Sequence, residues 1–142
     1  MARELFSEIR SNVPHLESTV IDGPEVYALH FPEQNGLQFP VDVYLDNGDE
    51  LHISIGDLFH CSWFPITQRI KRDAVRDGVI GFMEGEWRLS FQERKLFGWS
   101  VGREARFQCQ VEGKWETIGT DGLPWDAGLQ EPAEEFTNNP DA

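Results

Sequence analysis

Hydrophobic residues recur along the chain at two spacings, and each spacing predicts a different kind of element. Over residues 2–12 the large apolar side chains lie three or four positions apart, as on one face of a helix, and Pro14 follows this run. Elsewhere β-branched and aromatic residues gather in short stretches, several of them alternating with polar residues, which is typical of strands. These stretches are residues 18–22, 25–31, 41–55, 87–92, 97–103 and 105–111.

A second, longer helix is expected in the middle of the chain. Thr67 is a good N-cap residue, and the helix would end near Asp77 or Met83. Small or apolar residues at intervals of four would form its buried stripe, namely Ile66, Ile70, Ala74 and Gly78. Its arginines alternate with acids, which favours a salt-bridged helix surface over a phosphate-binding one.

The clearest local signal is a hairpin between residues 41 and 55. A two-residue Asn47-Gly48 turn would place Leu51 beside Tyr44, whereas a three-residue loop of residues 46–48 would place Leu51 opposite Val43. A slip of one residue exchanges the two faces of a strand, so the register that separates apolar from polar residues is preferred. We therefore predict the three-residue loop. The same reasoning predicts a second three-residue loop at 111–113, with Cys109 opposite Trp115.

Helices set between runs of antiparallel strands indicate an α+β fold. We expect a mostly antiparallel sheet of five to seven strands, with an N-terminal helix and one longer central helix packed on it. Residues 1–120 would form a single domain. Residues 121–142 would form an acidic C-terminal tail, partly disordered or docked through Trp125.

The distribution of charge along the chain indicates which kind of partner the protein could bind. The chain has 142 residues with 25 Asp and Glu against 12 Lys and Arg, and a net charge of -13 argues against a nucleic-acid partner. Residues 11–68 contain nine acids and no Lys or Arg, so this stretch could attract a basic protein. The candidate binding residues in this stretch are Asp42, Asp46, Asp49, Glu50, Asp57 and Trp63.

Neither a targeting segment nor a resident metal or cofactor is predicted. The chain has no apolar run of the length of a membrane span, and its beginning does not resemble a signal peptide, so we expect a cytoplasmic protein without a membrane partner. Two cysteines are too few for a disulfide framework. The four histidines, His15, His30, His52 and His60, match no compact metal-ligand spacing. The sequence does not indicate an oligomeric state.

Two arrangements could carry catalytic chemistry, and each has a simpler structural explanation. Asp42 opposite His52 would form a carboxylate–imidazole pair, although a solvated cross-strand pair is preferred on an open sheet. Cys61 could act as a nucleophile, but its neighbour His60 would point to the other face of a strand, so His30 or His52 would have to be the base. A core cysteine is preferred. We predict no catalytic residue beyond these candidates.

Two functional hypotheses follow. The base-free acidic stretch and the lack of catalytic motifs favour a non-catalytic protein-binding or inhibitor domain of the immunity type, directed at a basic protein. The alternative is a small-molecule-binding domain or enzyme with an apolar pocket around residues 59–64.

Overall fold

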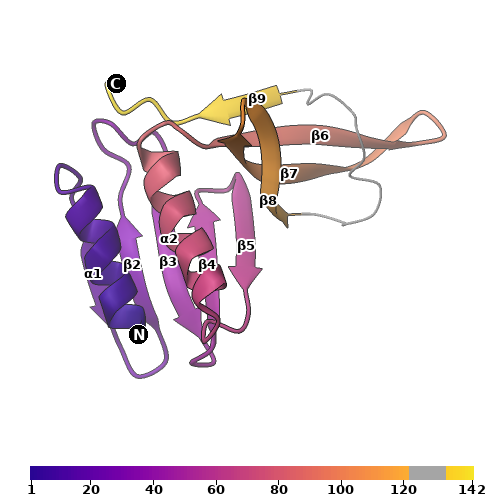
Figure 1. The fold of residues 1–142 in the computed structure, drawn as a ribbon. Coiled ribbons are helices and arrows are strands. Elements are labelled where there is room, and N and C mark those ends of the chain that lie inside the picture. The colour runs from indigo at the N-terminus through magenta and orange to yellow at the C-terminus, as the bar shows by residue number, and fades with distance from the viewer. Residues whose placement is uncertain (122–133) are drawn as a thin grey trace.

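The computed structural model describes residues 1–121 and 134–142, apart from the side chains of residues 94–96, 100 and 101, and shows two helices and two antiparallel sheets (Figure 1). The five-stranded sheet has the order β1 (Thr19–Asp22), β2 (Tyr27–Phe31), β3 (Val41–Asp46), β4 (Glu50–Ile55) and β5 (Phe59–Trp63). The four-stranded sheet has the order β8 (Lys114–Asp121), β7 (Trp99–Val111), β6 (Arg88–Leu96) and β9 (Glu134–Thr137). The helices are α1 (Ala2–Asn12) and α2 (Arg69–Met83).

The predicted α+β class and both predicted helices are confirmed. The strands divide between two sheets instead of joining in one: β1 to β5, which precede α2 in the chain, pair with one another, and so do β6 to β9, which follow it. Neither α1 nor α2, the helices of the described residues, is long and apolar enough to cross a membrane.

The two helices lie against the five-stranded sheet. The sequence predicted the buried face of α1 better than that of α2. In α1 the expected apolar face of Leu5, Phe6 and Ile9 is buried. In α2 the expected stripe is correct only in part: Ile66, just before the helix, and Gly78 are buried, whereas Ile70 in the first turn is 77% exposed. The large buried side chains of the helix lie further along it. These are Val75, Val79, Phe82 and Met83. Gly78 and Phe82, in the C-terminal half of α2, lie against Phe107 of the four-stranded sheet.

The start of α2 also differs from the prediction. Gln68 occupies the N-cap position and no side chain caps the helix, so Thr67 does not have the predicted role. The expected close approach does occur at Gly78, where a Cβ atom would lie 2.8 Å from a ring carbon of Phe107. Phe107 also packs on Phe59 of β5 and Phe82 of α2, with ring centroids 5.4 and 6.2 Å away. One hydrophobic core therefore joins both sheets and α2.

The register of the β3–β4 hairpin differs from the prediction by two residues. Asn47 and Gly48 both have positive φ and form the turn, which the Asp49 amide closes by donating to the Asp46 carbonyl at 3.2 Å. Asp49 is an extra residue after this turn, so Asp46 lies opposite Glu50 and Val43 opposite Ile53. Since a shift of two residues keeps each side chain on its face, the separation of apolar and polar faces is still as predicted.

The β7–β8 hairpin also departs from the prediction. Its turn has two residues, Glu112 and Gly113, both with positive φ, and Trp115 therefore lies opposite Gln110 instead of Cys109. Beyond β8, the expected docking through Trp125 falls outside the described residues. The C-terminal residues are held by β9 and by buried Asn138, which donates to the carbonyl oxygens of Met83 and Gly36 at 2.6 and 2.9 Å.

Candidate functional site

The five-stranded sheet has one face on the core and one face turned away from the helices, which we call the outer face. Alternation along each strand decides the face, because successive side chains point to opposite sides. Leu29, Val43 and Ile53 point into the core, and their neighbours in the chain point outward. The polar residues of the outer face are Thr19 of β1, His30 of β2, Asp42, Tyr44 and Asp46 of β3, Glu50, His52 and Ser54 of β4, and His60 and Ser62 of β5.

Three aromatic side chains form a compact cluster in the middle of the outer face. The rings of Tyr44 and His52 lie opposite each other across β3 and β4, stacked with centroids 4.7 Å apart and planes within 2°. From β5, His60 Nε2 lies 2.9 Å from the Tyr44 hydroxyl and 3.2 Å from His52 Nδ1. These contacts hold the His52 ring in one orientation, with its Nε2 atom turned away from His60.

Two carboxylates lie near this Nε2 atom. Glu50 Oε1 is 3.7 Å from His52 Nε2, and Asp46 Oδ2 is 3.9 Å from it. Nε2 itself is buried and has no hydrogen-bond partner among the described residues. Burial, and then the negative charges of Asp46, Asp42 and Glu50, raise the pKa of the Tyr44 hydroxyl. The local field at this end of the outer face is therefore negative.

Asp42 has a different partner from the one predicted. It lies opposite Ser54, and its Oδ1 atom is 2.6 Å from His30 Nδ1 on β2. The predicted opposition of Asp42 and His52 is wrong because it depended on the hairpin register that Asp49 shifts. His30 and Asp42 thus form a carboxylate–imidazole pair at hydrogen-bond distance, and both side chains are about one-third exposed.

The fold separates the six candidate binding residues. Asp42, Asp46 and Glu50 share the outer face. Asp49 lies beside the hairpin turn, half-buried, and Asp57 is exposed in the turn at the opposite end of β4. Trp63 lies on the inner side, where its ring approaches Gly119 of β8. Half of the candidates therefore lie together on one surface.

Cys61 lies on the side of β5 away from the histidines. It is opposite Ile53, points inward and packs near Gly119, so the structure does not bring it together with His30 or His52. Burial raises the pKa of the Cys61 thiol, with a smaller contribution from the charge of Asp121. A thiol with a raised pKa is largely protonated at neutral pH, which makes it a poor nucleophile.

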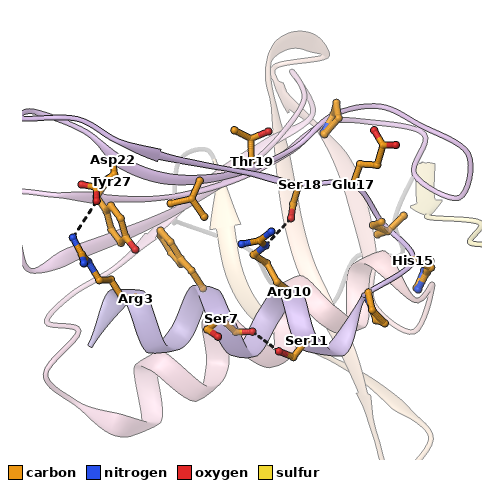
Figure 2. A pocket seen from close by; sticks show the side chains of 15 residues that line it. Arg3, Ser7, Arg10, Ser11, His15, Glu17, Ser18, Thr19, Asp22 and Tyr27 are labelled. Carbon is orange, nitrogen blue, oxygen red and sulfur yellow. Dashed lines mark hydrogen bonds and ion pairs between the residues drawn. The ribbon is translucent and has the colours of Figure 1, made fainter.

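An open hollow of about 910 Å³ lies between α1 and the chain leading into β1 (Figure 2). The sequence reasoning did not identify it, because its lining comes from separate elements. Figure 2 shows Arg3 beside Asp22 and Arg10 beside Ser18. Each arginine donates a hydrogen bond to its neighbour, with a donor–acceptor distance of 3.0 Å in both cases. Both arginines thus already have partners, and the candidate residues of the sheet do not line this hollow.

The sequence reasoning also missed the contact of His60 with Tyr44 and His52. One signal for it was available: His60 and His52 occupy strand positions of the same outward parity, which places them on one face once β4 and β5 pair. The geometry of the outer face is the basis for assigning a function, since no protein-family model, no curated protein and no solved structure matches this chain.

Proposed function

We propose that this protein is a non-catalytic protein-binding domain whose outer face binds a basic surface on a protein partner. One observation carries the proposal. Asp42, Asp46 and Glu50 share this face, and all five strands of the sheet lie within residues 11–68, which contain no Lys or Arg. Charge complementarity of this kind gives fast and selective association with a positively charged partner.

The acids of the outer face differ from the acids elsewhere in the chain. On α2, Asp73 and Asp77 are neutralised by Arg76, which lies 3.0 and 2.8 Å from them. On the outer face, the described ion pairs of Asp42, Asp46 and Glu50 are with histidines alone. Because no Lys or Arg of the described residues pairs with them, these carboxylates remain available to an incoming cation.

The aromatic cluster indicates which cation suits the face best. Arginine pairs with carboxylates through a planar fork and also stacks on aromatic rings. Exposed His60 and half-buried Tyr44 offer such rings beside the acids. An arginine-rich protein surface is therefore the preferred partner. Where such a surface surrounds an enzyme's active site, binding would make this domain an inhibitor of the immunity type.

The proposal can be tested by titrating the ¹⁵N-labelled protein with an oligo-arginine peptide and with folded arginine-rich proteins at physiological ionic strength. We expect the largest chemical-shift changes at the strand residues of the outer face. The variant Asp42→Asn/Asp46→Asn/Glu50→Gln should bind about tenfold or more weakly, a loss of about 1.4 kcal/mol.

A matched variant distinguishes the effect of the outer-face acids on binding from the effect of the total net charge. Glu4→Gln/Glu112→Gln/Glu116→Gln removes the same number of charges from exposed positions outside the five-stranded sheet. It should keep most of the affinity. Equal weakening in both variants, or shift changes spread evenly over the surface, would show that net charge alone drives binding and would contradict the proposal.

A further inference from the structure

We infer that Asp46, Glu50 and His52 form a binding site for a divalent transition-metal ion. The three side chains come from one hairpin, and one ligand atom from each lies within 4.8 Å of the other two. The sequence predicted no metal site, because no compact histidine or cysteine motif is present. The hairpin register, and not the spacing along the chain, brings these ligands together. This inference does not depend on the proposed binding of a protein.

The distances are close to those that a metal ion requires. Zinc binds histidine nitrogen and carboxylate oxygen at about 2.0–2.2 Å, so two ligand atoms in a tetrahedral site lie about 3.4 Å apart. His52 Nε2 lies 3.7 Å from Glu50 Oε1 and 3.9 Å from Asp46 Oδ2. The two carboxylates are partly exposed, and each would have to move closer to His52 Nε2 by about 0.3–0.5 Å to reach the separation of about 3.4 Å.

His52 is already oriented as a metal ligand. Its side chain is 12% exposed, its ring is stacked on Tyr44, and its Nε2 atom has no hydrogen-bond partner among the described residues. Its other nitrogen, Nδ1, lies 3.2 Å from His60 Nε2. A histidine that ligates a metal usually donates its second N–H to a neighbouring group, which fixes the ring. With the ring proton on Nδ1, the lone pair of Nε2 faces the two carboxylates.

The charges of the site also call for a cation. Asp46 and Glu50 lie directly opposite each other, and like charges in directly opposite positions destabilise a strand pair. Their described ion-pair contact is His52, and no lysine or arginine accompanies it in the described part of the chain. An imidazole nitrogen beside two carboxylates suits zinc, cobalt or nickel, whereas magnesium and calcium prefer oxygen ligands alone.

The test is a calorimetric titration of the full chain with Zn²⁺ at physiological ionic strength, with Co²⁺ absorption as a second readout. We expect saturable binding of one ion. Glu50→Gln, Asp46→Asn and His52→Phe should each weaken binding about tenfold or more, and His52→Phe keeps an aromatic ring against Tyr44. His60→Phe, which removes the partner of Nδ1 and of the Tyr44 hydroxyl but none of the three ligands, should weaken it about tenfold.

Asp42→Asn and Asp57→Asn are the matched controls, because each removes one negative charge without touching the three ligands. Both should bind Zn²⁺ as the unmodified chain does. The inference is overturned if no saturable site is found, if a control loses as much affinity as Glu50→Gln, or if Mg²⁺ binds as tightly as Zn²⁺. Glu50 and Asp46 are at least partly exposed, so their variants remain informative even if His52→Phe does not fold.

Discussion

Both sheets carry charged side chains on the face away from the core, but the two faces neutralise their charges in different ways. On the four-stranded sheet this face, which we call the polar face, is buried and its arginines are paired. Arg106 donates to Glu104 at 3.1 Å and to Gln92 at 2.8 Å. Arg88 donates to Gln108 at 2.9 Å, pairs with Glu135 and lies over the ring of Trp115.

The comparison shows which polar cluster is structural and which is available to a ligand. Buried charges persist when they are paired and hydrogen-bonded, and the polar face follows that rule. The outer face follows it at His30 and Asp42 but not at Asp46 and Glu50, which face each other beside a His52 nitrogen that has no hydrogen-bond partner among the described residues. We therefore expect substitutions on the polar face to affect stability and substitutions on the outer face to affect binding.

The largest effect is expected at Arg106, whose side chain is buried together with that of Glu104. Arg106→Met removes the cation from a buried ion pair, which typically costs about 3–5 kcal/mol of unfolding free energy. Urea unfolding followed by circular dichroism measures this loss. A change below 1 kcal/mol would mean that the pair behaves as an exposed one and that the two faces do not differ as described.

A smaller effect is expected at Gly119, where the two sheets meet. A Cβ atom at this position would lie 3.1 Å from Cys61 Sγ and 3.1 Å from a ring carbon of Trp63. Gly119→Ala should therefore destabilise the protein by about 1–2 kcal/mol through overpacking. Gly23→Ala is the control in the same unfolding assay, because its nearest contact would be an ordinary 3.5 Å. Equal effects of the two substitutions would show that the junction has room to adjust.

On the outer face we expect a small gain in unfolding free energy, in contrast to the losses expected for Arg106→Met and Gly119→Ala. Asp46→Asn/Glu50→Gln removes two like charges that lie directly opposite each other. It should leave the unfolding free energy unchanged or raise it by up to about 1 kcal/mol in low salt, without added metal. Urea unfolding at two salt concentrations measures it, since screening should reduce any gain. A marked loss of stability would instead make these acids part of the structural framework.

The smallest effect concerns Cys61, on the inner side of the same sheet. Burial raises the pKa of its thiol, so folding favours the neutral form. This contribution to stability is present below the ordinary thiol pKa and is lost as the pH rises through the raised value. In a Cys109→Ser background, Cys61 should react with iodoacetamide more slowly in the folded chain than in urea at the same pH. Equal rates would mean that Cys61 is open to solvent.

The elements were largely predictable, because the patterns that predict them are local. The apolar positions of residues 2–12 were enough to identify α1 and its buried face. The buried face of α2 was not predictable in the same way, since the packing of both sheets on its C-terminal half decides it. Ile70 fits an apolar stripe in the sequence, yet it is 77% exposed, while Lys71 and Arg72 of the same turn are half-buried.

The candidate site was predictable only in part. The sequence identified Asp42, Asp46 and Glu50, whose outward direction follows from alternation along the strands. It placed Asp42 opposite His52, because the loop was assigned to residues 46–48. The turn at Asn47 and Gly48 with the extra residue Asp49 gives a register that the hydrophobic pattern cannot distinguish from the predicted one, since both separate the faces equally well.

The sequence by itself determined the helices, most of the strands, the two faces of each strand and the absence of Lys and Arg from residues 11–68. Tertiary structure alone decided that Tyr44 lies on His52, that His60 joins them from β5, and that Asp46, Glu50 and His52 Nε2 meet. This division has a physical reason. The face to which a side chain points is set by the position of its residue in the strand, which the sequence pattern reveals. The side chains that it contacts depend on turn geometry and on the pairing of strands, which the pattern does not reveal.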